Sequence, residues 1–118
     1  MTYKLHSLIT ASGSFELRRY RTPEGKMPLS EWLNDLDVNT GDRISVYIER
    51  MKVGNFGNSR SVGEGISELK IDFGPGYRVY YLLDGSSVVV LLCGGDKGSQ
   101  QKDIRLARQF ATDYWRRK

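Results

Sequence analysis

The sequence predicts an α+β domain in which helices pack against an antiparallel-rich sheet. Three observations carry this prediction. Apolar residues recur at helical spacing in residues 28–53, alternate with a period of two in residues 66–83, and return to helical spacing in residues 99–115. A chain of 118 residues can bury one modest core, so we expect a single domain, with the element order β-α-α-β-β-β-α.

The chain is expected to open with a strand and a turn. Alternation in residues 14–20 indicates a strand. Residues 1–13 alternate only in part, so they form either an edge strand or a loose tail that extends the domain. Thr22-Pro-Glu-Gly-Lys26 is typical of a turn and leads toward the helices.

A helical hairpin is predicted next, packed on one face of the sheet. The first helix starts at Pro28, which a first turn tolerates, and the second spans residues 40–53. Asn39 or Thr40 can cap the second helix, and Gly54 can end it. The two apolar stripes are Leu29, Trp32, Leu33 and Leu36 in the first helix, and Ile44, Tyr47, Ile48 and Met51 in the second.

The second half of the chain is expected to supply most of the sheet. Residues 54–65, rich in Gly, Asn and Ser, are predicted to be a loop, and two strands follow in residues 66–83 around a Gly-Pro-Gly turn. Residues 88–93 are apolar on both sides, which is typical of an interior strand. After Gly94-Gly95, a last helix is expected over residues 99–115.

Strand parity divides the two strands around the turn into two faces. One face should pack on the helices, and the other should point outward. The first set comprises Leu69, Ile71, Phe73, Val79 and Tyr81, and the outward set comprises Glu68, Lys70, Arg78 and Tyr80. The outward residues lie in adjacent strands and can form a site. Alternatively, they form cross-strand ion pairs on a solvated face, each worth less than about 1 kcal/mol.

Composition narrows the classes of protein to consider. The formal net charge of +4 and the pI of about 9.3 favour an anionic partner, either a nucleic acid or an acidic protein segment, although a merely basic soluble protein has the same composition. No apolar run approaches the roughly 20 residues that span a bilayer. The N-terminus has no signal-peptide pattern, so we expect a cytoplasmic protein without membrane contact.

The single cysteine and single histidine point away from metal or thiol chemistry. Cys93 lies in an apolar run and is expected to be a core residue, and it has no partner for an internal disulfide. His6 lies in a distant segment. Because zinc sites are built from Cys and His clusters, we expect no metal site, and we expect no cofactor.

Polar residues directly after the interior strand are further candidates for a site. Asp96 and Lys97 follow the Gly-Gly pair, where a rigid sheet could aim them into a shared site. Alternatively, Asp96 or Ser99 caps the last helix. Lys97 is the more informative residue, because a cation near a helix N-terminus is mildly unfavourable. The glycines match no nucleotide-binding fingerprint.

Five segments of the chain, in order, carry a family resemblance. They are Pro28-Leu-Ser-Glu-Trp-Leu33, Gly54-Asn-Phe-Gly57, Val62-Gly-Glu-Gly-Ile-Ser-Glu-Leu-Lys-Ile71, Gly74-Pro-Gly-Tyr-Arg-Val-Tyr-Tyr81 and Leu91-Leu-Cys-Gly-Gly-Asp-Lys-Gly-Ser-Gln100. Together they resemble the HigB-like "addiction module killer" branch of the RelE/ParE toxin superfamily. The resemblance covers about residues 14–115, nearly the whole chain.

The resemblance implies the toxin of a type II toxin–antitoxin system, held inactive by a cognate antitoxin. Resemblance to the HigB-like and RelE-like members implies that the protein is a metal-independent endoribonuclease that cleaves translated mRNA on the ribosome. It also implies that operator DNA is bound only through the antitoxin complex. ParE-like members share the fold but poison DNA gyrase, so a gyrase-directed toxin is the second hypothesis. A toxin-fold binding module without catalysis is the third.

The resemblance also implies a site. Basic residues in matching strands of the RNase members correspond to Lys70 and Arg78, and a third basic position falls at about Lys97. Histidine-based acid–base roles cannot be transferred, because the C-terminal region here has no His. Ribose 2′-OH attack on a phosphate needs cations for the developing charge, a proton acceptor and a proton donor.

Roles for the candidate residues follow from those needs. Lys70 and Arg78 suit charge stabilisation, and Lys97 suits a proton donor or a phosphate clamp. The proton acceptor would be Glu68 or Asp96. The remaining expected RNA contacts are Tyr80, through stacking on a base or orienting the phosphate, and Gln100.

Overall fold

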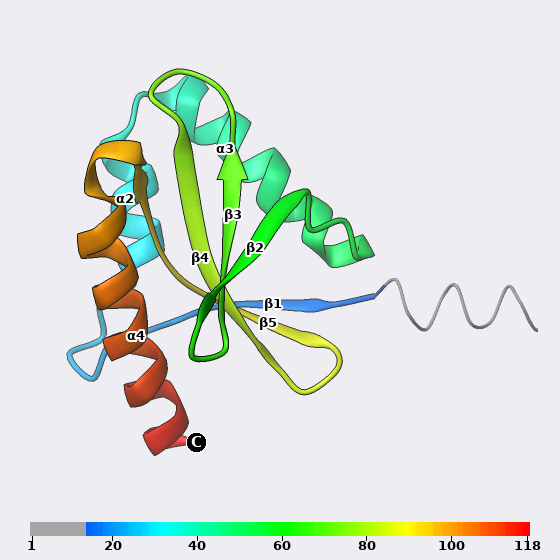
Figure 1. Ribbon diagram of the computed structural model, residues 1–118, viewed down its shortest axis with the longest axis vertical. Helices are drawn as coiled ribbons and strands as arrows, with labels where there is room; N and C mark the ends of the chain where they lie inside the picture. Colours follow the sequence, from blue (N-terminus) through cyan, green and yellow to red (C-terminus); the bar gives the residue numbers. More distant parts are fainter. Residues whose placement is uncertain (1–13) are drawn as a thin grey trace, which may run out of the picture.

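The computed structural model describes residues 14–118, and the predicted edge strand or tail in residues 1–13 lies outside this part. The elements are β1 (Glu16–Arg19), α2 (Pro28–Asp35), α3 (Val38–Arg50), the 3-10 turn η1 (Met51–Val53), β2 (Asn58–Gly63), β3 (Ile66–Ile71), β4 (Tyr77–Asp84), β5 (Val88–Asp96), the 3-10 turn η2 (Lys97–Ser99) and α4 (Gln100–Arg117). Within the described residues, three α-helices and one five-stranded sheet confirm the predicted α+β class (Figure 1).

The sheet is mixed, with the spatial order β1-β5-β4-β3-β2. Strands β2 to β5 pair antiparallel with their neighbours, whereas β1 pairs parallel with β5. Because β5 lies between β1 and β4, its backbone is paired on both sides. The interior position predicted for residues 88–93 is therefore confirmed, and the strand continues to Asp96.

The second helix starts earlier than the sequence pattern indicated. Asp37, not Asn39 or Thr40, is its N-cap, and the Asp37 carboxylate accepts from the Thr40 backbone N–H at 2.9 Å and from the Thr40 hydroxyl at 2.8 Å. The apolar stripe begins at Ile44, about two turns after the cap, which is why the pattern placed the start too late. The expected end is confirmed, since Gly54 adopts a φ of 81° after η1.

The prediction of a loop through residues 54–65 is wrong for its second half. Residues 58–63 form β2, which pairs antiparallel with β3 from Asn58 opposite Lys70 to Gly63 opposite Ile66. The strand lies at a sheet edge, and only Ser59 and Val62 are half-buried. An edge strand needs few apolar residues, so this segment lacks the alternation that would have revealed it.

Each face of the sheet has its own hydrophobic core. The core shared with α2 and α3 contains the predicted helix-facing residues, with Leu69, Ile71, Val79 and Tyr81 buried and Phe73 packed beside them. The other core lies between the sheet and α4 and is formed by Tyr20, Ile66, Tyr80, Leu82, Val90, Leu92, Cys93, Ala107 and Ala111. The predicted core role of Cys93 is confirmed, and burial raises the pKa of its thiol to about 12.

The face predicted to point outward is covered by α4. Consequently Glu68, Tyr80 and Arg78 are only 1%, 0% and 6% exposed, and Lys70 alone of the four is exposed to solvent. The prediction that Glu68, Arg78 and Tyr80 point outward is therefore wrong. The alternative of ion pairs on a solvated face is also wrong, because this face is buried under α4. The sequence pattern identified the two faces correctly but gave no sign of which face the last helix would cover.

Gly94 and Gly95 bring helices close to β5 from opposite faces. A Cβ atom on Gly94 would lie 2.4 Å from the Trp32 ring of α2, and one on Gly95 would lie 1.8 Å from the Asp103 Oδ2 of α4. Strand β5 continues through both residues to Asp96. The pair allows two layers of helix to pack tightly on one strand.

Candidate functional site

Glu68 is the centre of a buried polar cluster that joins three strands and α4. Its Oε1 accepts from Arg60 Nε of β2 at 3.0 Å, and its Oε2 accepts from the Tyr80 hydroxyl of β4 at 3.1 Å. Oε2 also accepts from Gln100 Nε2 of α4 at 2.8 Å and lies 3.6 Å from Arg78 Nε. The carboxylate therefore neutralises and positions its neighbours.

The pKa values in the cluster follow from burial and these contacts. Burial alone would raise the pKa of Glu68, but hydrogen bonds from Arg60, Gln100 and Tyr80 outweigh it, and the pKa lies below its ordinary value. Burial, together with the Glu68 charge, raises the pKa of the Tyr80 hydroxyl. Glu68 is thus held as an anion and Tyr80 as a neutral donor.

Arg78 is fixed in the middle of the sheet, between Lys70 on β3 and Gly95 on β5. Its Nη1 donates to the Gly76 carbonyl at 3.3 Å, while its Nε has no hydrogen-bond partner within residues 14–118. The ion pair with Glu68 holds the guanidinium in a partly dry position. A fixed cation in such surroundings interacts more strongly with an anion than one in free solvent.

A hollow of about 380 Å³ opens at the turn between β3 and β4, and three of the predicted site residues line it. Lys70 comes from β3, Arg78 from β4 and Lys97 from η2, directly after β5. The Lys70 ammonium lies 3.7 Å from Asp72. Two cations from adjacent strands and a third from the turn after β5 thus line one cavity, which is suited to an anionic group such as a phosphate.

The other predicted site residues do not line this cavity. Asp96 Oδ1 accepts from the Gly98 N–H at 2.8 Å and from the Ser99 N–H at 3.2 Å, so Asp96 caps η2, the 3-10 turn that leads into α4, rather than α4 itself. Gln100 donates to Glu68 from the first turn of α4. Tyr80 lies in the core with its ring fully covered, so its surface is not available for stacking on a base.

Four residues at or beside the site were not assigned to it from the sequence. Asp72 and Phe73 line the hollow, and the Arg43 guanidinium lies 3.7 Å from the centre of the Phe73 ring. Arg60 donates to Glu68 and forms an ion pair with it from the unpredicted strand β2. The Asp72-Phe73 pair directly precedes the Gly-Pro-Gly turn, and that position next to a tight turn is the signal that could have identified them.

Neither a metal-binding cluster nor a membrane-spanning helix occurs in the described residues. Within residues 14–118, no group of three or more His, Cys, Asp or Glu side chains is arranged to hold a metal ion. None of the helices in this range is both long and apolar enough to cross a bilayer.

The architecture fits a known class of protein fold. A five-stranded mixed sheet with three helices is compatible with the RelE-like toxin fold. The sequence model of the family described as Phage derived protein Gp49-like (DUF891) matches residues 31–111, and the chain belongs to this family. An uncharacterized protein of Haemophilus influenzae is 43% identical over 88 residues, which cover 74% of this chain and 89% of the relative.

Proposed function

We propose that this protein is the toxin of a type II toxin–antitoxin system and acts as a metal-independent endoribonuclease on translated mRNA. The observation that carries the proposal is the hollow lined by Lys70, Arg78 and Lys97, where three cations converge on one cavity. Membership of the Gp49-like family and the toxin-compatible fold support it. The HigB-like resemblance of the sequence motifs agrees with this assignment.

The reaction we propose is an internal transfer at a phosphodiester. The ribose 2′ oxygen attacks the adjacent phosphorus, the bond from phosphorus to the 5′ oxygen breaks, and the products carry a 2′,3′-cyclic phosphate and a 5′ hydroxyl. Negative charge grows on the phosphate oxygens in the transition state. Arg78 and Lys70 stabilise this charge, and Lys97 clamps the phosphate or protonates the leaving 5′ oxygen.

Glu68 serves this reaction as a positioning residue. Both of its oxygens already accept hydrogen bonds, and its pKa is lowered, so it is a poor acceptor for the 2′ proton. Asp96 already accepts two backbone hydrogen bonds through Oδ1. Asp72 lines the hollow itself, and we assign the proton acceptor to this carboxylate.

The partners follow from the same proposal. The toxin binds mRNA, acts on it at the ribosome in the cytoplasm, and is held inactive by a cognate antitoxin protein. Contact with operator DNA is made through the antitoxin complex. The net charge of +4 favours association with the RNA backbone.

The proposal is tested by brief induction of the protein in bacterial cells, followed by mapping of RNA 5′ ends. We expect new 5′-hydroxyl ends within translated messages and rapid arrest of protein synthesis. Replacing the exposed cations, as Lys70→Ala with Lys97→Ala, should reduce cleavage by about a hundredfold or more, because both act on the transition-state charge. The soluble fraction and the thermal unfolding of this variant should be unchanged.

Lys26→Ala provides the matched control, because Lys26 is an exposed cation in the turn before α2 and lies outside the hollow. It should leave cleavage intact. Full cleavage by the double variant would overturn the assignment of the hollow. A DNA-damage response on induction, without new RNA ends, would replace the nuclease with the gyrase-directed alternative.

A further inference from the structure

A second basic hollow lies beside the hollow lined by Lys70, Arg78 and Lys97, which is called the Lys70 hollow below. The second hollow has a volume of about 340 Å³ and is lined by residues 97–102, where η2 leads into α4. Lys97 lines both hollows, so the two cavities meet at this side chain. Among the described residues, Lys97 and Lys102 are the charged ones that line the second hollow, and no carboxylate lines it.

The outer face of α4 continues this positive charge beyond the second hollow. Residues three apart on a helix are neighbours on its surface, so Arg105 lies next to Lys102, about one turn further along. The exposed residues of α4 from its first turn to position 112 are Gln101, Lys102, Arg105, Gln109 and Thr112. This stripe therefore combines two cations with three neutral polar side chains and contains no carboxylate.

Both carboxylates of α4 lie off this stripe. Asp103 is only 5% exposed and lies against Gly95 of β5. Asp113 is half-buried and forms an ion pair with Arg117. The positive charge on the outer face of the helix is therefore not neutralised by the acidic residues of the same helix.

The cations along this face are free to bind a ligand. Lys97, Lys102 and Arg105 are exposed, and within residues 14–118 none of them forms an ion pair. Residues 1–13 contain no Asp or Glu, so they supply no side-chain carboxylate either. The surplus positive charge next to the Lys70 hollow favours a ligand with several negative charges.

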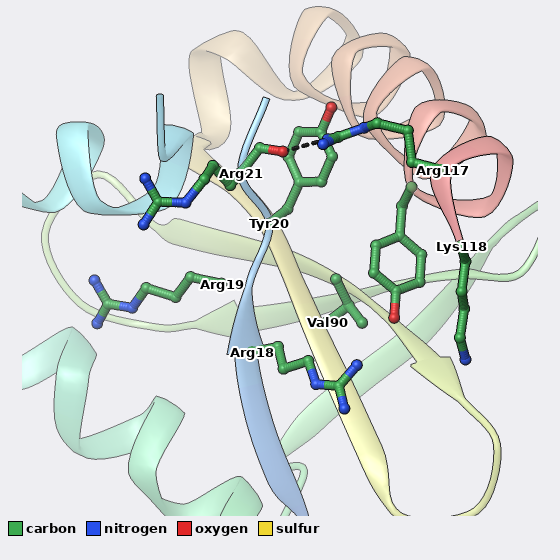
Figure 2. Close-up of a pocket in the computed structure, with 8 residues that line it drawn as sticks. Arg18, Arg19, Tyr20, Arg21, Val90, Arg117 and Lys118 are labelled. Atoms are coloured by element: carbon green, nitrogen blue, oxygen red, sulfur yellow. Dashed lines mark hydrogen bonds between the residues drawn. The ribbon is translucent and has the colours of Figure 1, made fainter. Parts of the chain in front are cut away.

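The cations at the C-terminal end of α4 are different, because they are already occupied. Arg117 pairs with Asp113, and Lys118 pairs with Asp84. Figure 2 shows that Arg117 also donates to the Arg21 carbonyl, in the segment that follows β1. These contacts tie the end of the helix to the rest of the domain, whereas the cations near its start are unpaired.

We propose that Lys102 and Arg105 bind phosphates that neighbour the scissile phosphate in a single strand of RNA. The strand then runs from the Lys70 hollow, past Lys97, along the outer face of α4. This inference rests on the proposed function, which places the scissile phosphate in the Lys70 hollow. Gln101 lies beside the two cations and can donate to a phosphate or ribose oxygen.

The composition of the stripe favours a nucleic-acid backbone over a protein segment. Protein partners are usually anchored by apolar or aromatic side chains, and the exposed residues from Gln101 to Thr112 include none. Phosphates are bound by cations and polar donors, which lysine, arginine and glutamine side chains supply. The Lys70 hollow lies directly beside the start of this face, so one strand can occupy both.

The test compares two 2′-O-methyl RNA oligonucleotides, which lack the hydroxyl that attacks the phosphate. A trinucleotide can occupy the Lys70 hollow alone, whereas a nonanucleotide can also reach Lys102 and Arg105. Binding to the full-length protein is measured by fluorescence anisotropy at several salt concentrations. Lys102→Ala with Arg105→Ala should reduce the slope of log affinity against log salt for the nonanucleotide by about 1.4, since each phosphate contact on a single strand contributes about 0.7. The slope for the trinucleotide should not change.

Two controls separate phosphate contact from net charge. Lys26→Ala with Arg50→Ala removes two exposed cations that line neither hollow, so it should leave both slopes unchanged. Arg105→Lys keeps the charge and should retain the slope of the parent. Amide NMR spectra report whether each variant is folded. In the parent, the nonanucleotide should shift the Lys102 and Arg105 amides, and the trinucleotide should not.

The outcomes distinguish this inference from the function on which it rests. If the trinucleotide depends on Lys70 but the nonanucleotide gives the same slope with and without Lys102 and Arg105, the inference fails and the proposed function stands. Trinucleotide binding that is insensitive to Lys70→Ala would contradict the proposed function, and the inference with it. An octaglutamate peptide that binds at Lys102 and Arg105 more tightly than the nonanucleotide would assign this face to an acidic protein segment and overturn the assignment to RNA.

Discussion

Glu68 Oε2 lies 3.6 Å from Arg78 Nε, and both side chains are buried between the sheet and α4. The pair joins adjacent strands, and its guanidinium reaches the hollow that also contains Lys70 and Lys97. A buried cation is costly unless an anion compensates it. Glu68 therefore supports the fold and, under the proposed function, fixes the cation that meets the phosphate.

Replacing Glu68 by glutamine tests this pairing. Glu68→Gln keeps the size of the side chain but leaves the Arg78 charge uncompensated, so we expect the free energy of unfolding to fall by about 3 kcal/mol. Urea denaturation followed by circular dichroism measures this change. The matched control is Glu64→Gln, since Glu64 is exposed and pairs with Arg108 at the surface, where the expected change is within about 0.5 kcal/mol. Similar small losses in both variants would contradict the role of Glu68.

The pH dependence of stability should contain two opposite contributions. The pKa of Glu68 is lowered in the folded state, so its stabilisation is present above its ordinary value of 4.5 and is lost as pH falls through the folded pKa. Burial raises the pKa of Asp103, despite a hydrogen bond from the Ser99 hydroxyl. The ionised Asp103 therefore costs stability as pH rises from its ordinary value of 3.8 through the raised value.

An Asp103→Asn variant isolates the second contribution. Asparagine cannot ionise, so the stability of the variant relative to the parent should rise as pH increases from about 3 to about 7. Urea midpoints measured across this range give the comparison. The control is Asp35→Asn, at an exposed site at the end of α2, whose urea midpoint should change with pH in parallel with that of the parent. If the stability of Asp103→Asn relative to the parent stayed constant or fell as pH rises, the raised pKa of Asp103 would be contradicted.

Much of the fold follows from periodicity, and the exceptions have specific causes. The stripes in α2 and α3 and the parity of β3 and β4 predicted the core with those helices correctly, because each buries one regular face. Strand β2 was missed because it pairs mainly through its backbone at an edge and buries little. The exposure of the Glu68 face was predicted wrongly, because the position of α4 depends on packing that residue spacing does not encode.

The candidate site was predictable in its cations but not in its supporting contacts. Lys70, Arg78 and Lys97 were selected from strand position and resemblance, and they line one hollow. Arg60 could not be linked to Glu68 without the pairing of β2 with β3. Tyr80 was assigned to RNA stacking because parity placed it beside Arg78, but parity does not show that a helix covers the ring.

The two adjacent glycines of β5 offer a test of the layer packing. Gly95→Ala should lower the free energy of unfolding by about 2 kcal/mol, because its Cβ would overlap the Asp103 carboxylate. In an Asp103→Ala background the same change should cost much less, and a double-mutant cycle from urea denaturation measures the coupling. Gly98→Ala, where the nearest atom to the new Cβ is Asp96 Oδ1 at 3.3 Å, is the milder control. Additive losses would contradict a direct clash between positions 95 and 103.

Phe73, rather than Tyr80, should be the aromatic residue that contributes to RNA binding under the proposed function. Its ring lines the cation-rich hollow and stacks with the Arg43 guanidinium, so together they offer a surface for a base. Phe73→Ala should weaken binding of a short RNA by about 1 kcal/mol or more in fluorescence anisotropy, a typical loss for one stacked base. Tyr80→Phe retains the buried ring and removes only the hydroxyl that donates to Glu68, so it should lower stability by about 1 kcal/mol while leaving RNA affinity nearly unchanged. Weaker RNA binding by Tyr80→Phe together with unchanged binding by Phe73→Ala would contradict the assignment of the RNA contact to Phe73.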